Sequence, residues 1–177
     1  MYEPGDTVMY KPGDIITVSD KVQKGYSYKI TARAGRDFAP GFTPAYTPQE
    51  MLEMGVFEGK YCNDCRRELP ESWFAKAKVS DIPDPALNYF RVKSRQPLRV
   101  WQNKGWIIGP DPRGWFQWYC RYYLGRRLPD VDAEQIKRWR AFSRHAGQIR
   151  ANCMPGDVSC RPRQRQALLQ WSYDPFI

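Results

Sequence analysis

The fold is decided by residues 111–123, which read Asp111-Pro-Arg-Gly-Trp-Phe-Gln-Trp-Tyr-Cys-Arg-Tyr-Tyr123. The aromatic side chains of this stretch would cover nearly the whole circumference of a helix, and a helix that is apolar all round is usually buried. We therefore expect the central core helix here. Asp111 is its expected N-cap, Pro112 its first residue and Gly125 its left-handed stop.

The chain stays helical beyond this segment. Asp132 and Gln135 are spaced as a capping pair, and the apolar residues that follow recur every three or four positions, which is the period of one helix face. One amphipathic helix is expected over 132–153, packed against the aromatic helix. A last helix is expected to start at Pro162 and to stop before Pro175. The apolar stripe consists of Ile136, Trp139, Phe142, Ala146, Ile149 and Cys153.

The N-terminal part has a different character. Pro-Gly-Asp turns at 4–6 and 12–14 each precede a short β-prone run, at 7–10 and 15–18, and residues 26–33 alternate well enough for a third strand. The chain is thus predicted to be an α+β protein, with a small antiparallel β piece in residues 1–45. A mainly helical, Arg- and aromatic-rich body follows in residues 46–177, and both parts are expected to form one compact domain.

Between these parts the signals are mixed. Thr47, Pro48 and Glu50 have the spacing of a capping box with proline in the first turn, so a short helix is expected there, ending at Gly55. A second helical stretch is predicted over 70–78. Proline and glycine interrupt residues 81–110, which are expected to form a loop with a strand at 89–92 or 98–101.

The composition limits the kinds of partner that the chain is expected to bind. The 177 residues carry a net charge of +9, and 15% of them are aromatic. Neither a secretory signal nor an apolar run long enough to span a membrane is recognisable. We expect a soluble, cytoplasmic protein that meets an anionic partner and no membrane, with its oligomeric state left open.

The basic residues concentrate in the C-terminal part. Residues 112–177 hold twelve Lys and Arg, eleven of them Arg, against five Asp and Glu. Arginine pairs bidentately with phosphate and stacks on bases, which favours a nucleic-acid partner over a merely solvated basic face. Rings at a groove would stack on bases beside these arginines, as in single-strand binders. The expected contacts are Arg113, Arg121, Arg126, Arg127, Lys137, Arg140 and Arg144 to phosphate, with Trp118 or Tyr122 stacking.

Four of the five cysteines have a spacing that allows a metal site. Cys62 and Cys65 are separated by two residues, and Cys153 with Cys160 would complete a four-thiolate structural zinc site. The alternative is that these thiols are reduced, small hydrophobic residues, as expected for Cys120 in the aromatic helix. No other cofactor is expected.

Two further function classes remain open. A base-processing enzyme with the logic of a glycosylase needs an aromatic slot, a basic rim and an acid, for which Asp64 and Asp111 are the candidates. The competing role of Asp111 is the N-cap itself. An adaptor that binds an acidic protein would also account for the positive charge.

Three stretches carry a resemblance to a known family: residues 47–61, 111–127 and 160–171. In them the chain resembles an uncharacterised family of small proteins associated with bacteria, large viruses and some eukaryotes. The resemblance covers most of residues 40–177. It implies no activity and no catalytic residue.

Overall fold

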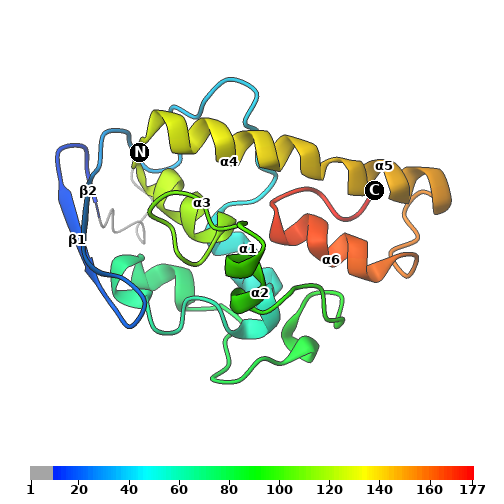
Figure 1. Cartoon of the computed structure of the whole chain (residues 1–177). Coiled ribbons are helices and arrows are strands. Elements are labelled where there is room, and N and C mark those ends of the chain that lie inside the picture. The colour runs from blue at the N-terminus through cyan, green and yellow to red at the C-terminus, as the bar shows by residue number, and fades with distance from the viewer. Residues whose placement is uncertain (1–9) are drawn as a thin grey trace.

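The structure, a computed structural model, describes residues 10–177 and has an α+β architecture (Figure 1). A two-stranded antiparallel sheet near the N-terminus lies at one end of the molecule, and the helices α5 and α6 lie at the other (Figure 1). Within residues 10–177, no helix combines the length and the apolar character needed to cross a membrane. The elements are β1 Ile15–Ser19, β2 Lys24–Lys29, α1 Pro48–Met54, η1 Phe57–Gly59, η2 Arg66–Glu68, η3 Glu71–Phe74, η4 Pro85–Leu87, α2 Leu98–Asn103, α3 Trp115–Leu124, α4 Pro129–Phe142, α5 Arg144–Asn152 and α6 Pro162–Gln170.

The hairpin turns one face to the helical body. Ile16 pairs with Tyr28 across the strands, and both side chains are buried on that inner face together with Val18. The expected strand at 15–18 is confirmed, whereas only residues 26–29 of the stretch 26–33 belong to β2, and Ile30 after it forms an isolated bridge with Arg126. The strand expected at 7–10 falls mostly on residues 7–9, outside the described residues.

Helix α3 is the buried centre of the molecule, as its all-round aromatic surface predicts. Nine of its ten residues are buried, and Gly125 ends it in a left-handed conformation with φ +116°. The expected start was wrong, because the helix begins at Trp115 with Gly114 as N-cap. The carboxylate of Asp111 is drawn instead to two buried arginines, so it cannot cap a helix at Pro112.

Aromatic rings from three parts of the chain meet around α3. Phe42, from the loop before α1, lies 5.5 Å from the Trp118 ring and 5.0 Å from the Trp139 ring of α4. These edge-on and tilted contacts are the geometry that aromatic pairs prefer. The segment that connects the sheet to the helical body therefore also contributes to the core.

Helices α4 and α5 carry the predicted apolar stripe, but they are two helices. They run nearly in line, with Ser143 between them (Figure 1). Ile136, Trp139, Ala146 and Ile149 of the stripe are buried. The spacing therefore gave the correct buried face across the break.

The middle of the chain departs most from expectation. The capping box at Thr47 is present, with reciprocal bonds between Thr47 and Glu50, and α1 ends at the predicted Gly55. The helix expected over 70–78 is only the short 3-10 turn η3. A strand at 98–101 was wrong, because these residues begin α2.

Candidate functional site

A buried ion network joins the hairpin to the helical body, centred on Arg121. The guanidinium binds Glu68 through Nε (2.7 Å) and Nη2 (3.0 Å), and it binds Asp111 through Nη1 (2.9 Å). Its two remaining N–H groups donate to the backbone oxygen of Pro110 and to the side chain of Gln23. All five donors of a side chain that is 0% exposed are thus satisfied within the protein.

Arg126 closes the network from the residue after the α3 stop. It donates to both carboxylate oxygens of Asp111, at 2.8 and 2.6 Å, and its Nη1 also donates to the Tyr26 hydroxyl. Burial would lower the pKa of Arg126, but the hydrogen bonds and charge of Asp111 outweigh it and raise the pKa. Two arginines and two carboxylates, Asp111 and Glu68, balance in charge, so the buried network is neutral.

The network corrects three predicted contacts. Arg121 and Arg126 have no exposed surface for a phosphate, and Arg113 is 5% exposed, with its guanidinium between Asp20 (3.4 Å) and Asp64 (3.0 Å). A charged group that is buried away from water needs a partner of opposite charge. These arginines therefore turn inward to carboxylates. Their function is to join elements of the fold.

The predicted stacking rings are buried as well, in the hydrophobic core around α3. Trp118 is 0% exposed and donates its indole N–H to Asp132 at 2.8 Å, so neither ring face is open to a base. Tyr122 is 1% exposed, and its hydroxyl accepts from the backbone of Ala39. Arg127 lies 3.8 Å above the Tyr122 ring and donates to four backbone carbonyls, which fixes it in place.

Three of the predicted cations remain on the surface. Lys137, Arg140 and Arg144 are exposed along α4 and the start of α5, as the helical spacing predicts. Arg140 donates one hydrogen bond to the backbone of Pro40, whereas Lys137 and Arg144 form no ion pair within residues 10–177.

The predicted acids are also placed. Asp111 is 0% exposed and both its oxygens are bound, so it is closed to a substrate. Asp64 is partly exposed and paired with Arg113. Neither residue lines the cavity described below.

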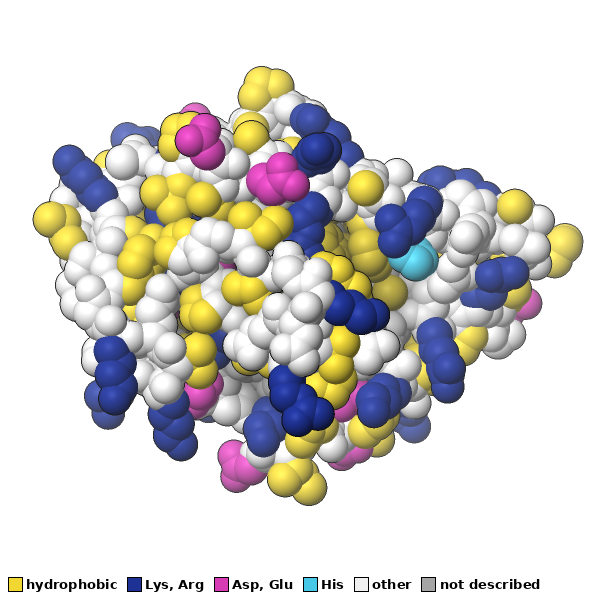
Figure 2. All heavy atoms as spheres, in the orientation of Figure 1, with side chains coloured by type: hydrophobic (Ala, Val, Ile, Leu, Met, Phe, Trp, Pro, Cys, Tyr) yellow, Lys and Arg dark blue, Asp and Glu magenta, His cyan; other side chains and the backbone are white. Residues whose placement is uncertain are grey.

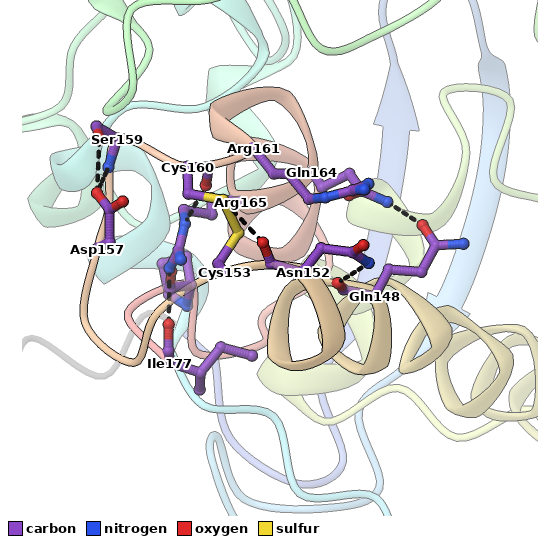
Figure 3. The surroundings of a disulfide bond; sticks show 11 residues. Gln148, Asn152, Cys153, Asp157, Ser159, Cys160, Arg161, Gln164, Arg165 and Ile177 are labelled. Atoms are coloured by element: carbon purple, nitrogen blue, oxygen red, sulfur yellow. Dashed lines mark hydrogen bonds between the residues drawn. A yellow bond between two sulfur atoms is a disulfide. The ribbon is translucent and has the colours of Figure 1, made fainter.

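The four-thiolate zinc site is wrong. Cys153 and Cys160 form a disulfide that joins the end of α5 to the start of α6 (Figure 3). Arg165 lies beside it and donates to the backbone oxygens of Cys160, Pro175 and Ile177, which ties the C-terminal end of the chain to this corner. Disulfide sulfurs are not available as thiolate ligands, and this pair also contradicts the expectation that all five thiols are reduced.

The other three cysteines lie together. Cys62, Cys65 and Cys120 are free and buried, and Cys62 hydrogen-bonds to both of the others. The bond from Cys120, together with burial, raises the pKa of Cys62 well above its usual range. The thiols are therefore held neutral, and the described residues contain no cluster of Cys, His, Asp and Glu suited to a metal ion.

A cavity of about 540 Å³ opens on the opposite side of α3 from the hairpin. Its walls come from η1, from the segment 93–106 that includes α2, from the start of α3, and from α4 and α6. Figure 2 shows Lys and Arg side chains bordering a strip of hydrophobic side chains on this face of the molecule. The lining residues are Phe57, Tyr61, Lys93, Ser94, Arg95, Gln96, Pro97, Trp101, Trp106, Gly114, Trp115, Phe116, Arg138, Arg163, Gln170 and Trp171.

Hydrogen bonds hold these walls together. Ser94 donates to the backbone of Arg163 and accepts from Gln170 through its own carbonyl, which fixes the 93–97 segment to α6. Arg138 of α4 donates to the carbonyl of Trp106 at 2.8 Å and fixes the turn after α2. Gly114 completes the wall, because a Cβ there would lie 3.4 Å from the Trp101 ring.

The cations of the cavity differ from those of the buried network. Lys93, Arg95, Arg138 and Arg163 line it, no Asp or Glu does, and none of the four takes part in an ion pair within the described range. Burial lowers the pKa of Arg95 and of Arg138, and only more distant charges, including Glu58 and Glu134, oppose this. An uncompensated, partly desolvated cation is a favourable place for an anion.

Sequence reasoning missed this cavity because most of one wall lies in the stretch expected to be loop. The signal present there was the interleaving of basic and aromatic residues: Lys93, Arg95, Trp101, Lys104 and Trp106. No spacing rule connects them to α4 and α6, which meet them only in the folded chain. In comparisons with family models, curated proteins and solved structures, nothing matches this chain.

Proposed function

We propose that this protein binds nucleic acid at the aromatic, cationic cavity. The observation that carries the proposal is the convergence of four cations without carboxylate partners on a cavity lined by four tryptophans, Trp101, Trp106, Trp115 and Trp171. A nucleic-acid strand offers an anion at every phosphate and a π-face at every base. The two kinds of group in the cavity match these two features.

The charge distribution supports a polyanion as the partner. Because Arg113, Arg121 and Arg126 are neutralised by carboxylates inside the fold, the net charge of +9 rests on exposed Lys and Arg elsewhere. Lys137, Arg140 and Arg144 on α4 and α5 belong to that exposed set. They provide further contacts for a strand longer than the cavity accommodates.

Binding to short single-stranded DNA and RNA, measured by fluorescence anisotropy at low and high salt, tests the proposal. We expect salt-sensitive binding, and Arg163→Ala is expected to weaken it and to lower the slope of log K against log salt by about 1, the loss of one phosphate contact. Arg163 is exposed, and its contact with the wall residue Ser94 is made by its backbone oxygen, which alanine retains, so the cavity keeps its shape in this variant. Arg33→Ala is the matched control, because it removes one exposed arginine outside the cavity.

Two results would contradict the proposal. One is the absence of salt-sensitive binding to either strand. The other is an equal loss of affinity in Arg163→Ala and Arg33→Ala, which would leave only a general effect of charge. Polyglutamate in place of the strand examines the adaptor alternative, since an acidic-protein surface would bind it as tightly.

A second candidate, a base-releasing enzyme, is favoured by one further observation. Glu58 is 4% exposed, its Oε1 has no hydrogen-bond partner among the described residues, and its charge acts on Arg95 in the cavity wall. Phe57 and Glu58 both have positive φ, 53° and 57°, a strained conformation that is often found at functional sites. Glu58 is not itself among the residues that line the cavity, but it directly follows Phe57, which is, and it therefore replaces Asp64 and Asp111 as the candidate acid.

This second candidate function predicts that Glu58 is required for catalytic turnover and not for strand binding. In Glu58→Gln the strand affinity is expected to persist, while hydrolytic release of a free base from an oligonucleotide falls by roughly 100-fold or more, as when an acid–base group is removed. Chromatographic detection of released base measures this. Wild-type protein that releases no base from any of the four nucleotides in DNA or RNA would rule the activity out and leave the binding proposal intact.

A further inference from the structure

The size of the cavity limits what part of a nucleic acid it accepts. About 540 Å³ is typical of a small-molecule site and accommodates one ring system with its sugar and phosphate. Its floor consists of rings that are almost fully buried, Trp115 at 5% and Phe116 at 2% exposed. A duplex cannot enter such a cavity, so its occupant is a nucleotide that is not paired in a helix.

The aromatic walls favour a flat occupant. Trp115 stacks on Trp171 at 4.8 Å and on Tyr119 at 5.2 Å between ring centroids, and Trp171 stacks on Phe142 at 4.7 Å, so these two tryptophans are already stacked within the fold and offer their edges to the cavity. Rings already held by their neighbours lose little conformational entropy when a ligand binds. Trp106 is 40% exposed at the rim, a large apolar surface that a stacked ring would cover.

The polar groups are arranged for an anion. Arg138 is oriented by two hydrogen bonds from Nη1, to the carbonyl of Trp106 and to Gln135, while its Nη2 has no acceptor in residues 10–177. Arg95 is half-buried, and its side chain makes no hydrogen bond or ion pair within that range. Both guanidinium groups therefore line the cavity with N–H donors that no described protein atom accepts.

Two other polar side chains of the lining, Gln170 and Ser94, already have partners within the walls. Gln170 accepts from the backbone of Phe57 and donates to the carbonyl of Ser94, and the Ser94 hydroxyl donates to Arg163. They maintain the walls and have little capacity left to read the edge of a base. Recognition by stacking and phosphate contact tolerates every base, because every base has a π-face.

From these observations we infer that the cavity binds one unpaired nucleotide, with the base stacked against Trp106 at the rim and the phosphate on Arg95 and Arg138. This rests on the proposed nucleic-acid binding and narrows it to a single-nucleotide subsite. Both the ring and the phosphate contribute, so a mononucleotide binds better than either of its parts. A strand is bound where a base is free to leave the stack, at an end, a gap or a single-stranded segment.

Titration of tryptophan fluorescence with adenosine 5′-monophosphate, adenosine and inorganic phosphate tests the inference. The monophosphate is expected to bind at least about tenfold more tightly than adenosine, because it adds charge-assisted hydrogen bonds, and more tightly than inorganic phosphate. Arg95→Gln is expected to remove most of the preference for the monophosphate over adenosine and to leave adenosine binding unchanged. Trp106→Ala is expected to weaken both, and Arg33→Gln neither.

The outcomes separate this inference from the proposed function. Strand binding without any binding of the monophosphate would overturn the single-nucleotide site while the protein remains a nucleic-acid binder. Binding of the monophosphate without strand binding would support the site and reject the proposed function. The inference would also be overturned if Arg95→Gln kept the preference for the monophosphate over adenosine, or if benzoate bound as tightly as the monophosphate. Either result would mean that the cavity does not recognise the phosphate of a nucleotide.

Discussion

Replacing Asp111 with Asn is expected to lower the free energy of unfolding by about 3–5 kcal/mol, the cost of leaving buried arginine charge without its partner. The carboxylate is 0% exposed and is shared by Arg121 and Arg126 at 2.6 to 2.9 Å. Asn keeps the shape of the side chain, so the loss reports charge and hydrogen bonding rather than a cavity. For a domain whose total stability is typically 5–15 kcal/mol, this is a large fraction.

Urea unfolding followed by circular dichroism measures the effect, with Asp81→Asn as the control. Asp81 is exposed and takes part in no ion pair in the described structure, so its replacement is expected to change stability by less than about 0.5 kcal/mol. The double variant Asp111→Asn, Arg126→Met is expected to recover part of the loss, because one of the stranded charges is gone. A loss below about 1 kcal/mol in Asp111→Asn would show that the network is not held by this carboxylate.

Gly125→Ala is expected to destabilise the fold by about 3 kcal/mol or more, through backbone strain together with overpacking. Gly125 has φ +116°, and a Cβ there would lie 2.0 Å from the backbone oxygen of Ala32. Its own carbonyl accepts hydrogen bonds from Thr31 and Ala32, so the added methyl group meets backbone that has no room to move. The segment that follows β2 and the end of α3 would have to separate.

The same substitution at Gly147 is expected to have the opposite effect on stability. Gly147 lies inside α5, and no atom is within 4 Å of the position that a Cβ would take. Alanine there is expected to stabilise the protein by about 0.5–1 kcal/mol, through the better helix propensity. Thermal unfolding of the two variants provides the comparison, and a loss at Gly125 no greater than the change at Gly147 would contradict the close approach of the two backbones.

The arginines of this protein divide into two groups with different consequences. Arg113, Arg121 and Arg126 are buried against carboxylates, and their loss is expected to affect folding. Arg95, Arg138 and Arg163 line the cavity without such partners, and the changes proposed at Arg95 and Arg163 are expected to affect binding. The composition counts both groups as the same positive charge, although only the second group lines the cavity.

Local rules predicted part of the secondary structure, although the capping pair expected at Asp132 and Gln135 was wrong, because α4 begins at Pro129. The capping box at Thr47, the stop at Gly125, the buried stripe of α4 and α5 and the start of α6 at Pro162 follow from spacing within one turn or one helix face. The start of α3 was not predicted correctly, because the Asp111 carboxylate pairs with Arg121 and Arg126 instead of capping the helix. The break at Ser143 was also missed, since it leaves the buried face unchanged.

The sequence by itself determined that an aromatic helix forms the centre, that a hairpin precedes the helical body and that the chain is strongly basic. Only the tertiary structure decided which charges are neutralised within the fold. Glu68 pairs with Arg121, 53 positions away in the sequence, and Asp20 pairs with Arg113, 93 positions away. It also decided that Cys153 pairs with Cys160, and that segment 93–106 forms a cavity with α4 and α6. The physical reason is that periodicity and capping act over a few residues. Ion pairing, burial and a cavity depend on segments that meet only when the chain has folded.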